Sequence, residues 1–103
     1  MSVMLEFAMF PTDKGESVSA YVSRIIEVIR DSGTAYQLTP MGTVIEVEEM
    51  EDALKIVQLA YDQLADDCDR IYSSLKFDIR KGSVGRLEGK IASIEEKIGG
   101  VKK

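Results

Sequence analysis

The residues of this chain that are best suited to chemistry are acids and a lysine at alternate positions of strand-like segments. Glu46 lies within the β-branched run 43–48, where acidic residues are uncommon. A carboxylate placed there can accept hydrogen bonds from a ligand or act as a general base. The other candidates, which offer carboxylate, ammonium, amide or hydroxyl groups, are Glu6, Gln37, Ser74, Lys76 and Asp78.

Thr43 begins the same run directly after Gly42, and two roles are open to it. Strict alternation along a strand places Thr43 on the side opposite Glu46. A bulge beside the glycine would turn its hydroxyl toward a ligand. The structural alternative is a hydroxyl that caps the turn.

Composition narrows the classes of function. The 103-residue chain carries a net charge of −5, which argues against nucleic acid because phosphate binding needs clustered Lys and Arg. The same charge favours a neutral or cationic ligand. There is no histidine and Cys68 is the one cysteine, so no zinc motif and no nucleophile–base pair can be proposed. We expect no metal and no enzyme activity, with general-base catalysis by Glu46 or Asp78 as the alternative.

The apolar segment at the N-terminus, residues 2–10, is too short and too acidic for a signal peptide or a membrane span. The length suits one hydrophobic core. We therefore predict a single domain, residues 1–103, in the cytoplasm and without a membrane partner.

The elements that must position the candidates follow from hydrophobic spacing. Alternation predicts strands, and spacings of three and four predict helices. The predicted strands are 2–9, 35–39, 43–48 and 71–80, and the predicted helices are 18–29, 50–68 and 87–98. The order β-α-β-β-α-β with an extra C-terminal helix is typical of an α+β, ferredoxin-like sandwich. Its sheet order is 4-1-3-2, with the first two helices on one face.

The candidate site residues should lie on the face of this predicted sheet that the first two helices do not cover. Leu5, Ile45 and Phe77 should face the helices, which places the polar residues of neighbouring strands together on the other side, the open face. One interpretation is a solvated face with ion pairs such as Glu6 with Lys76, each contributing roughly 0.2–1 kcal/mol. The other is a polar pocket that is completed when a partner subunit covers the face.

Two segments resemble the signatures of a known family. "MGTVIEVE" (41–48) and "DRIYSSLKFDIRKG" (69–82) are similar to the M-G-T-x-(I/L)-E run and the (S/T)-(S/T)-L-K-(I/F)-D-x-R strand of the small thiamine-binding-protein family. The matching positions are Gly42, Thr43, Glu46, Ser73, Ser74, Lys76, Asp78 and Arg80. Two features, a loop and a single residue, depart from the family pattern. Residues 12–15 replace a short Leu-Gly turn, and Val47 stands where a glycine often follows the glutamate.

The resemblance implies a ferredoxin-like fold, homodimers or homotetramers, and binding of thiamine or its hydroxymethylpyrimidine moiety rather than catalysis. It implies no cofactor besides such a ligand. Thiamine carries a cationic thiazolium and an aminopyrimidine, which carboxylates and neutral hydrogen-bonding groups can recognise. The candidates are Glu46, Glu6 and Asp78 as carboxylates, Thr43, Gln37 and Ser74 as neutral groups, and Lys76 for an anion or to hold a carboxylate.

The C-terminal helix gives a separate reason to expect self-association. Its stripe of Ile91, Ile94 and Ile98 must dock onto something, since an isolated helix of this length is marginal. A homo-oligomer, such as a tetramer built as a dimer of dimers, would cover this stripe and the open face. The alternative function is therefore a structural or regulatory homo-oligomer without a small-molecule ligand.

Overall fold

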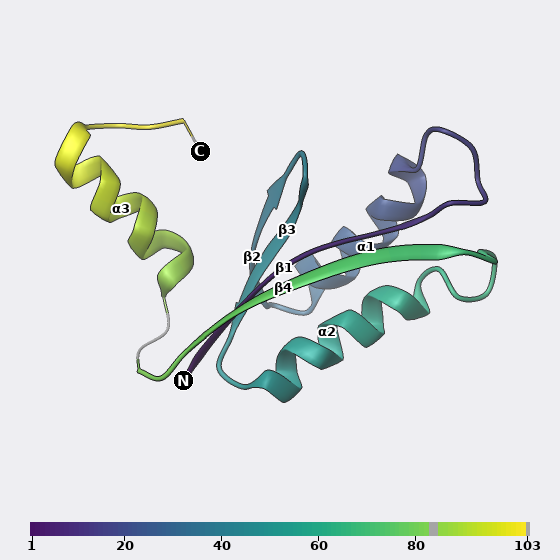
Figure 1. Ribbon diagram of the computed structural model, residues 1–103, viewed down its shortest axis with the longest axis horizontal. Coiled ribbons are helices and arrows are strands. Elements are labelled where there is room, and N and C mark those ends of the chain that lie inside the picture. Colours follow the sequence, from purple (N-terminus) through teal and green to yellow (C-terminus); the bar gives the residue numbers. More distant parts are fainter. Residues whose placement is uncertain (83–84, 103) are drawn as a thin grey trace.

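The computed structural model describes residues 1–82 and 85–102. The elements in chain order are β1 (Ser2–Pro11), α1 (Ser19–Asp31), β2 (Ala35–Thr39), β3 (Gly42–Val47), α2 (Met50–Asp62), β4 (Ile71–Arg80) and α3 (Arg86–Ile98) (Figure 1). This order confirms the predicted ferredoxin-like α+β fold with an extra C-terminal helix. The segment between the predicted strand 71–80 and the predicted helix 87–98 lies partly outside the described residues.

The strands form an antiparallel sheet in the order β2-β3-β1-β4, as the element order predicts. Alternate residues of β1 point to one side, and Val3, Leu5, Phe7 and Met9 are all buried there. Helix α2 packs against β1 and β3, and α1 packs against β1, on this side, which we call the helix face. Most of the remaining core comes from the helices, β3 and the segment after α2, namely Ile25, Ile29, Ile45, Ala53, Ile56, Ala60, Leu64 and Cys68.

The prediction of a helix over 50–68 was wrong in its last six residues. The α-helix ends at Asp62, and a series of turns follows. Ala65 and Cys68 still donate backbone hydrogen bonds to carbonyls four residues earlier, which keeps Leu64 and Cys68 at helical spacing. Both side chains are buried, so the apolar pattern extends beyond the helix itself.

The edge strand β4 is less covered than the pattern suggested. Leu75 pairs with Phe7 and Ile79 with Val3, so both lie on the helix face. They nevertheless remain 40% and 51% exposed, because α1 and α2 lie over β1 and β3 instead. The apolar pattern of β4 therefore indicates the side of the sheet correctly but not the degree of burial.

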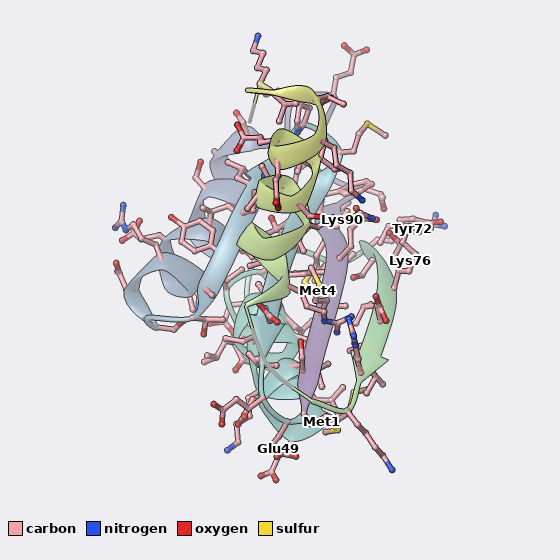
Figure 2. All side chains as sticks on the ribbon, turned by 90° about the vertical axis from the view of Figure 1, so that its left-hand side faces the viewer. Met1, Met4, Glu49, Tyr72, Lys76 and Lys90 are labelled. Carbon is pink, nitrogen blue, oxygen red and sulfur yellow. The ribbon has the colours of Figure 1, made fainter. Side chains whose placement is uncertain are left out.

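Helix α3 lies on the opposite face from α1 and α2, so part of the predicted open face is covered by this chain itself (Figure 2). It contacts β3, β1 and β2. Its apolar stripe is half-buried at Leu87 and Ile91 and exposed at Ile94 and Ile98. Among residues 1–82 and 85–102, no helix has the length and apolar character needed to cross a membrane.

Candidate ligand-binding site

The strand register brings six of the seven predicted site residues to the face that carries α3. Gln37 and Glu6 both lie opposite Val44, and Glu6 also lies opposite Lys76. In the next row, Met4 lies between Glu46 and Asp78. Ser74 is on the same side, opposite Ala8. The exception is Thr43, which pairs with Phe7 and Leu38 on the helix face.

Glu46 is 8% exposed and holds the first turn of α3. The Gly85 N–H lies 3.0 Å from both carboxylate oxygens, and the N–H groups of Arg86 and Leu87 donate at 3.1 and 3.3 Å. The Ser2 hydroxyl is the fourth donor to this carboxylate, at 2.6 Å. A helix leaves its first N–H groups without intrahelical acceptors, and this carboxylate satisfies three of them. Glu46 therefore caps α3 from a different element of the fold.

The electrostatics of Glu46 fit this capping role. Burial by itself would raise the pKa of the carboxyl group. The hydrogen bonds from Ser2 and from the N–H groups of Arg86, Leu87 and Gly85 outweigh burial and lower the pKa below its usual value. A negative charge is also favourable beside the positive end of the helix dipole. Glu46 is thus held as a carboxylate whose oxygens already accept protein donors.

Arg86 fastens the same helix turn to the sheet. Its Nε donates to Ser2 Oγ at 2.9 Å, and its Nη2 donates to the carbonyls of Ser2 and Asp78 at 2.9 and 2.7 Å. Its Nη1 donates to the Asp78 carboxylate at 2.9 Å. Ser2 Oγ thus joins Arg86 to Glu46 in a continuous hydrogen-bonded chain. The Arg86 side chain is only 16% exposed, so its bonds to Ser2 are partly shielded from water, whereas the Asp78 side chain is 74% exposed. Together these bonds fix where α3 begins.

A cavity of about 810 Å³ lies between α3 and the sheet. This volume falls within the range of about 300–1,000 Å³ that is common for small-molecule sites. The sheet contributes apolar and charged side chains, and the first turns of α3 contribute two glycines and two cations. The main lining residues are Met4, Glu6, Val44, Lys76, Asp78 and Arg80 from the sheet, the N-cap residue Gly85, and Arg86, Gly89 and Lys90 from α3.

The predicted site residues have different relations to this cavity. Glu6, Lys76 and Asp78 line it, whereas Gln37 and Glu46 share the face without lining it. Glu6 and Lys76 form the cross-strand ion pair that the sequence suggests, at 3.1 Å. Both side chains are at least half exposed, so this pair adds little to stability. Ser74 lines a smaller adjoining hollow of about 210 Å³ with Glu6 and Lys76.

The first signature also has structural duties around the β2–β3 turn. A Cβ on Gly42 would lie 2.9 Å from the backbone oxygen of Phe7, so this position needs glycine for the close approach of β1. Thr43 stays in regular register and is buried on the helix face, without a bulge. The turn is capped by Thr39 instead, whose hydroxyl donates to Gly42 O and accepts from the N–H groups of Met41 and Gly42. The turn-capping alternative for Thr43 is therefore wrong.

Sequence reasoning missed Ser2 and Arg86 as parts of this site. Alternation along β1 does put Ser2 on the same side as Glu6, which is a signal that could have included it. Arg86 had no such signal, because its role depends on where α3 docks. Within the described part of the chain, no cluster of acidic or cysteine side chains is arranged to hold a metal ion.

Comparison with known proteins places these features in a family. Residues 5–95 match the family described as thiamine-binding protein. A UPF0045 protein of Methanocaldococcus jannaschii is 37% identical over 94 residues, which cover 91% of this chain and 93% of that protein. A UPF0045 protein of Mycobacterium bovis is 35% identical over 95 residues, covering 92% and 93% of the two chains.

Solved structures agree with the sequence comparison. The crystal structure of the Methanocaldococcus jannaschii protein superposes with a TM-score of 0.79 over 92% of this chain and 97% of that one. A Thermotoga maritima protein, suggested in its description to act in thiamine biosynthesis or salvage, gives a TM-score of 0.77 over 91% and 99%. At 22% identity, the second likeness bears on the fold alone. The family match over most of the chain, supported by these relatives, shows that this protein belongs to the thiamine-binding protein family.

Proposed function

We propose that this protein binds thiamine or its hydroxymethylpyrimidine moiety in the cavity between α3 and the sheet, and that it does so without catalysing a reaction. The observation that carries the proposal is the cavity itself, which opens on signature residues of a family named for thiamine binding. We also propose that the protein acts in the cytoplasm.

The lining of the cavity offers partners for a flat heteroaromatic ring. Met4 and Val44 give apolar contact on the sheet side, which suits the face of a pyrimidine. The carboxylates of Glu6 and Asp78 can accept hydrogen bonds from its amino group. Glu46 was the leading sequence candidate for this role, but its oxygens already accept four protein groups. We therefore assign direct ligand contact to Glu6 and Asp78, and a positioning role to Glu46.

Titration calorimetry and thermal shift with thiamine and hydroxymethylpyrimidine test the proposal. A ligand present at a hundredfold excess over its dissociation constant should stabilise the fold by about 2.7 kcal/mol. Glu6→Gln should weaken binding by about 1 kcal/mol, through loss of a charged acceptor that is partly exposed to water. Glu27→Gln, at an exposed position of α1, is the matched control and should bind as the native protein does. Absence of binding by both compounds would overturn the proposal.

The alternative, a homo-oligomer without a small-molecule ligand, has its own supporting observation. Leu75 and Ile79 on β4 and Ile94 and Ile98 on α3 are large apolar side chains that this chain leaves at least 40% exposed. We propose that further copies of the chain cover them in a dimer or tetramer, with or without ligand. Light scattering at tens of micromolar tests the assembly. The calorimetry above separates an oligomer that binds thiamine from one that binds neither compound.

A further inference from the structure

The charges around the cavity are unbalanced. Among the lining residues that the structure describes are the cations Lys76, Arg80, Arg86 and Lys90 and the carboxylates Glu6 and Asp78, so these cations exceed these carboxylates by two. The chain as a whole has the opposite sign, with a net charge of −5. Positive charge is therefore concentrated around the 810 Å³ cavity on this face.

Ion pairing identifies which cations carry this excess. Lys76 pairs with Glu6 at 3.1 Å, and Arg86 pairs with Asp78 at 2.9 Å. Among the side chains that the structure describes in residues 1–82, 85–87 and 89–102, no carboxylate forms an ion pair with Arg80 or Lys90. The two approach the cavity from different elements. Arg80 is at the end of β4, opposite Ser2, and Lys90 is one turn along α3 from Arg86. In Figure 2, the Lys90 and Lys76 labels lie on the side of α3 toward β4.

The usual anion site of a helix is already taken here. The N-terminus of α3 would ordinarily attract a phosphate through its free N–H groups. The N–H groups of residues 85, 86 and 87 instead donate to Glu46. An anion in the cavity must therefore be held by side chains, and Arg80 and Lys90 are the two whose charge is not already matched.

Free thiamine fits this charge pattern poorly, because its thiazolium is a cation. A phosphate ester adds a charge of about −1.5 to −2 at neutral pH and three acceptor oxygens. Arg and Lys both bind phosphate well. We propose that the cavity has a phosphate subsite formed by Arg80 and Lys90, and that its ligand is a phosphorylated form of thiamine or of the pyrimidine. This inference rests on the proposed function and specifies the ligand's charge. The ring then lies toward Met4 and Val44.

Calorimetry with thiamine, thiamine monophosphate and inorganic phosphate tests the subsite. The native protein should bind the monophosphate about tenfold to a hundredfold more tightly than thiamine, the ratio expected for charge-assisted hydrogen bonds. The double substitution Arg80→Gln and Lys90→Gln should reduce that ratio to near unity, with a modest gain in affinity for thiamine as repulsion of its cation is removed. Lys97→Gln, in the last turn of α3 and outside the cavity, is the control and should keep the native ratio.

The outcomes separate this inference from the proposed function. Equal affinity for thiamine and its monophosphate overturns the phosphate subsite and leaves thiamine binding standing. Retention of the preference in the double variant also overturns the assignment of Arg80 and Lys90. If inorganic phosphate binds the native protein and not the double variant while no thiamine compound binds, the subsite stands and the proposed ligand is wrong. Absence of all binding overturns both.

Discussion

Replacing Glu46 by glutamine keeps the size of the side chain but turns one carboxylate oxygen into an amide nitrogen. In the native protein both oxygens face donors, which are the Ser2 hydroxyl and the N–H groups of Gly85, Arg86 and Leu87. The new amide N–H groups would point at those donors. The substitution therefore removes acceptors at the first turn of α3 without opening a hole in the fold.

The expected magnitude follows from the bonds that are lost. A hydrogen bond to a charged group contributes about 1.5–3 kcal/mol. Loss of the negative charge beside the helix dipole adds about 0.3–1 kcal/mol. The total destabilisation has an upper limit, because α3 can detach from the sheet and expose its N–H groups to water. We therefore expect Glu46→Gln to weaken the docking of α3 by about 1.5–3 kcal/mol. The packing of α1 and α2 against the sheet should be unaffected.

Amide hydrogen exchange gives the most direct assay. The N–H groups of residues 85, 86 and 87 are bonded to Glu46, so their protection reports on this contact alone. Their exchange should accelerate about tenfold to a hundredfold in Glu46→Gln, while exchange in β1 stays as it is. Glu6→Gln is the matched control on the same face. Its partly exposed pair with Lys76 should change the free energy of unfolding by less than about 0.5 kcal/mol.

The dependence of stability on pH gives a second test of the contact between Glu46 and α3. Because the pKa of Glu46 is lower in the folded protein, its contribution is complete above the usual value of 4.5 and is lost as the pH falls through the folded pKa. The stability difference between the native protein and Glu46→Gln should therefore shrink below about pH 4.5. Hydrogen bonds from the Asp69 N–H and from Arg24 also lower the pKa values of Asp13 and Asp67, but both proteins share these effects. Unchanged exchange at the three amides, or a difference that is independent of pH, would refute the capping assignment.

Three further predictions follow from burial, close contact and exposed apolar surface. Ile45→Asp should unfold the protein, as judged by far-UV circular dichroism, because an unpaired charge at this fully buried position costs several kcal/mol. Gly42→Ala should destabilise by about 1–3 kcal/mol in urea titration, because its Cβ would meet the Phe7 backbone oxygen at 2.9 Å. Truncation after Gly89 removes Ile91, Ile94 and Ile98, and should reduce particle size in light scattering while the remaining domain keeps a cooperative thermal unfolding transition. A truncated chain that keeps the native particle size would show that α3 is not part of the assembly.

The fold was predictable because its signals are local. Alternation along β1 and the helical spacing in 18–29 each report which side of an element is buried, and the strand order follows from the element order. The same signals placed Glu6, Lys76 and Asp78 together, since register carries alternate side chains of neighbouring strands to one face. Alternation also predicted the side of the sheet on which Thr43 lies. A bulge would have moved Thr43 to the other side, but the β1–β3 and β2–β3 pairing is continuous at this residue.

The docking of α3 was not predictable in the same way. Helical spacing identified the helix, but its place depends on contacts among Glu46, Ser2 and Arg86, which come from three separate elements. Residues this far apart in sequence leave no periodic trace. An acidic residue inside a strand is the one local anomaly, and it could equally have signalled a ligand contact, an exposed ion pair or a cap for a distant helix.

The capping role changes how the first signature relates to ligand binding. Gly42 allows β1 to approach, Ile45 fills the core, and Glu46 holds the first turn of α3. None of these three lines the cavity, yet each supports a wall of it, because Gly85, Arg86, Gly89 and Lys90 reach the cavity only while α3 is docked. On this argument a change at Glu46 weakens ligand binding indirectly, in proportion to how far it releases α3. In the proposed site, a change at Glu6 would act on the ligand directly and leave the amides of α3 protected, so exchange and affinity measured together distinguish the two roles.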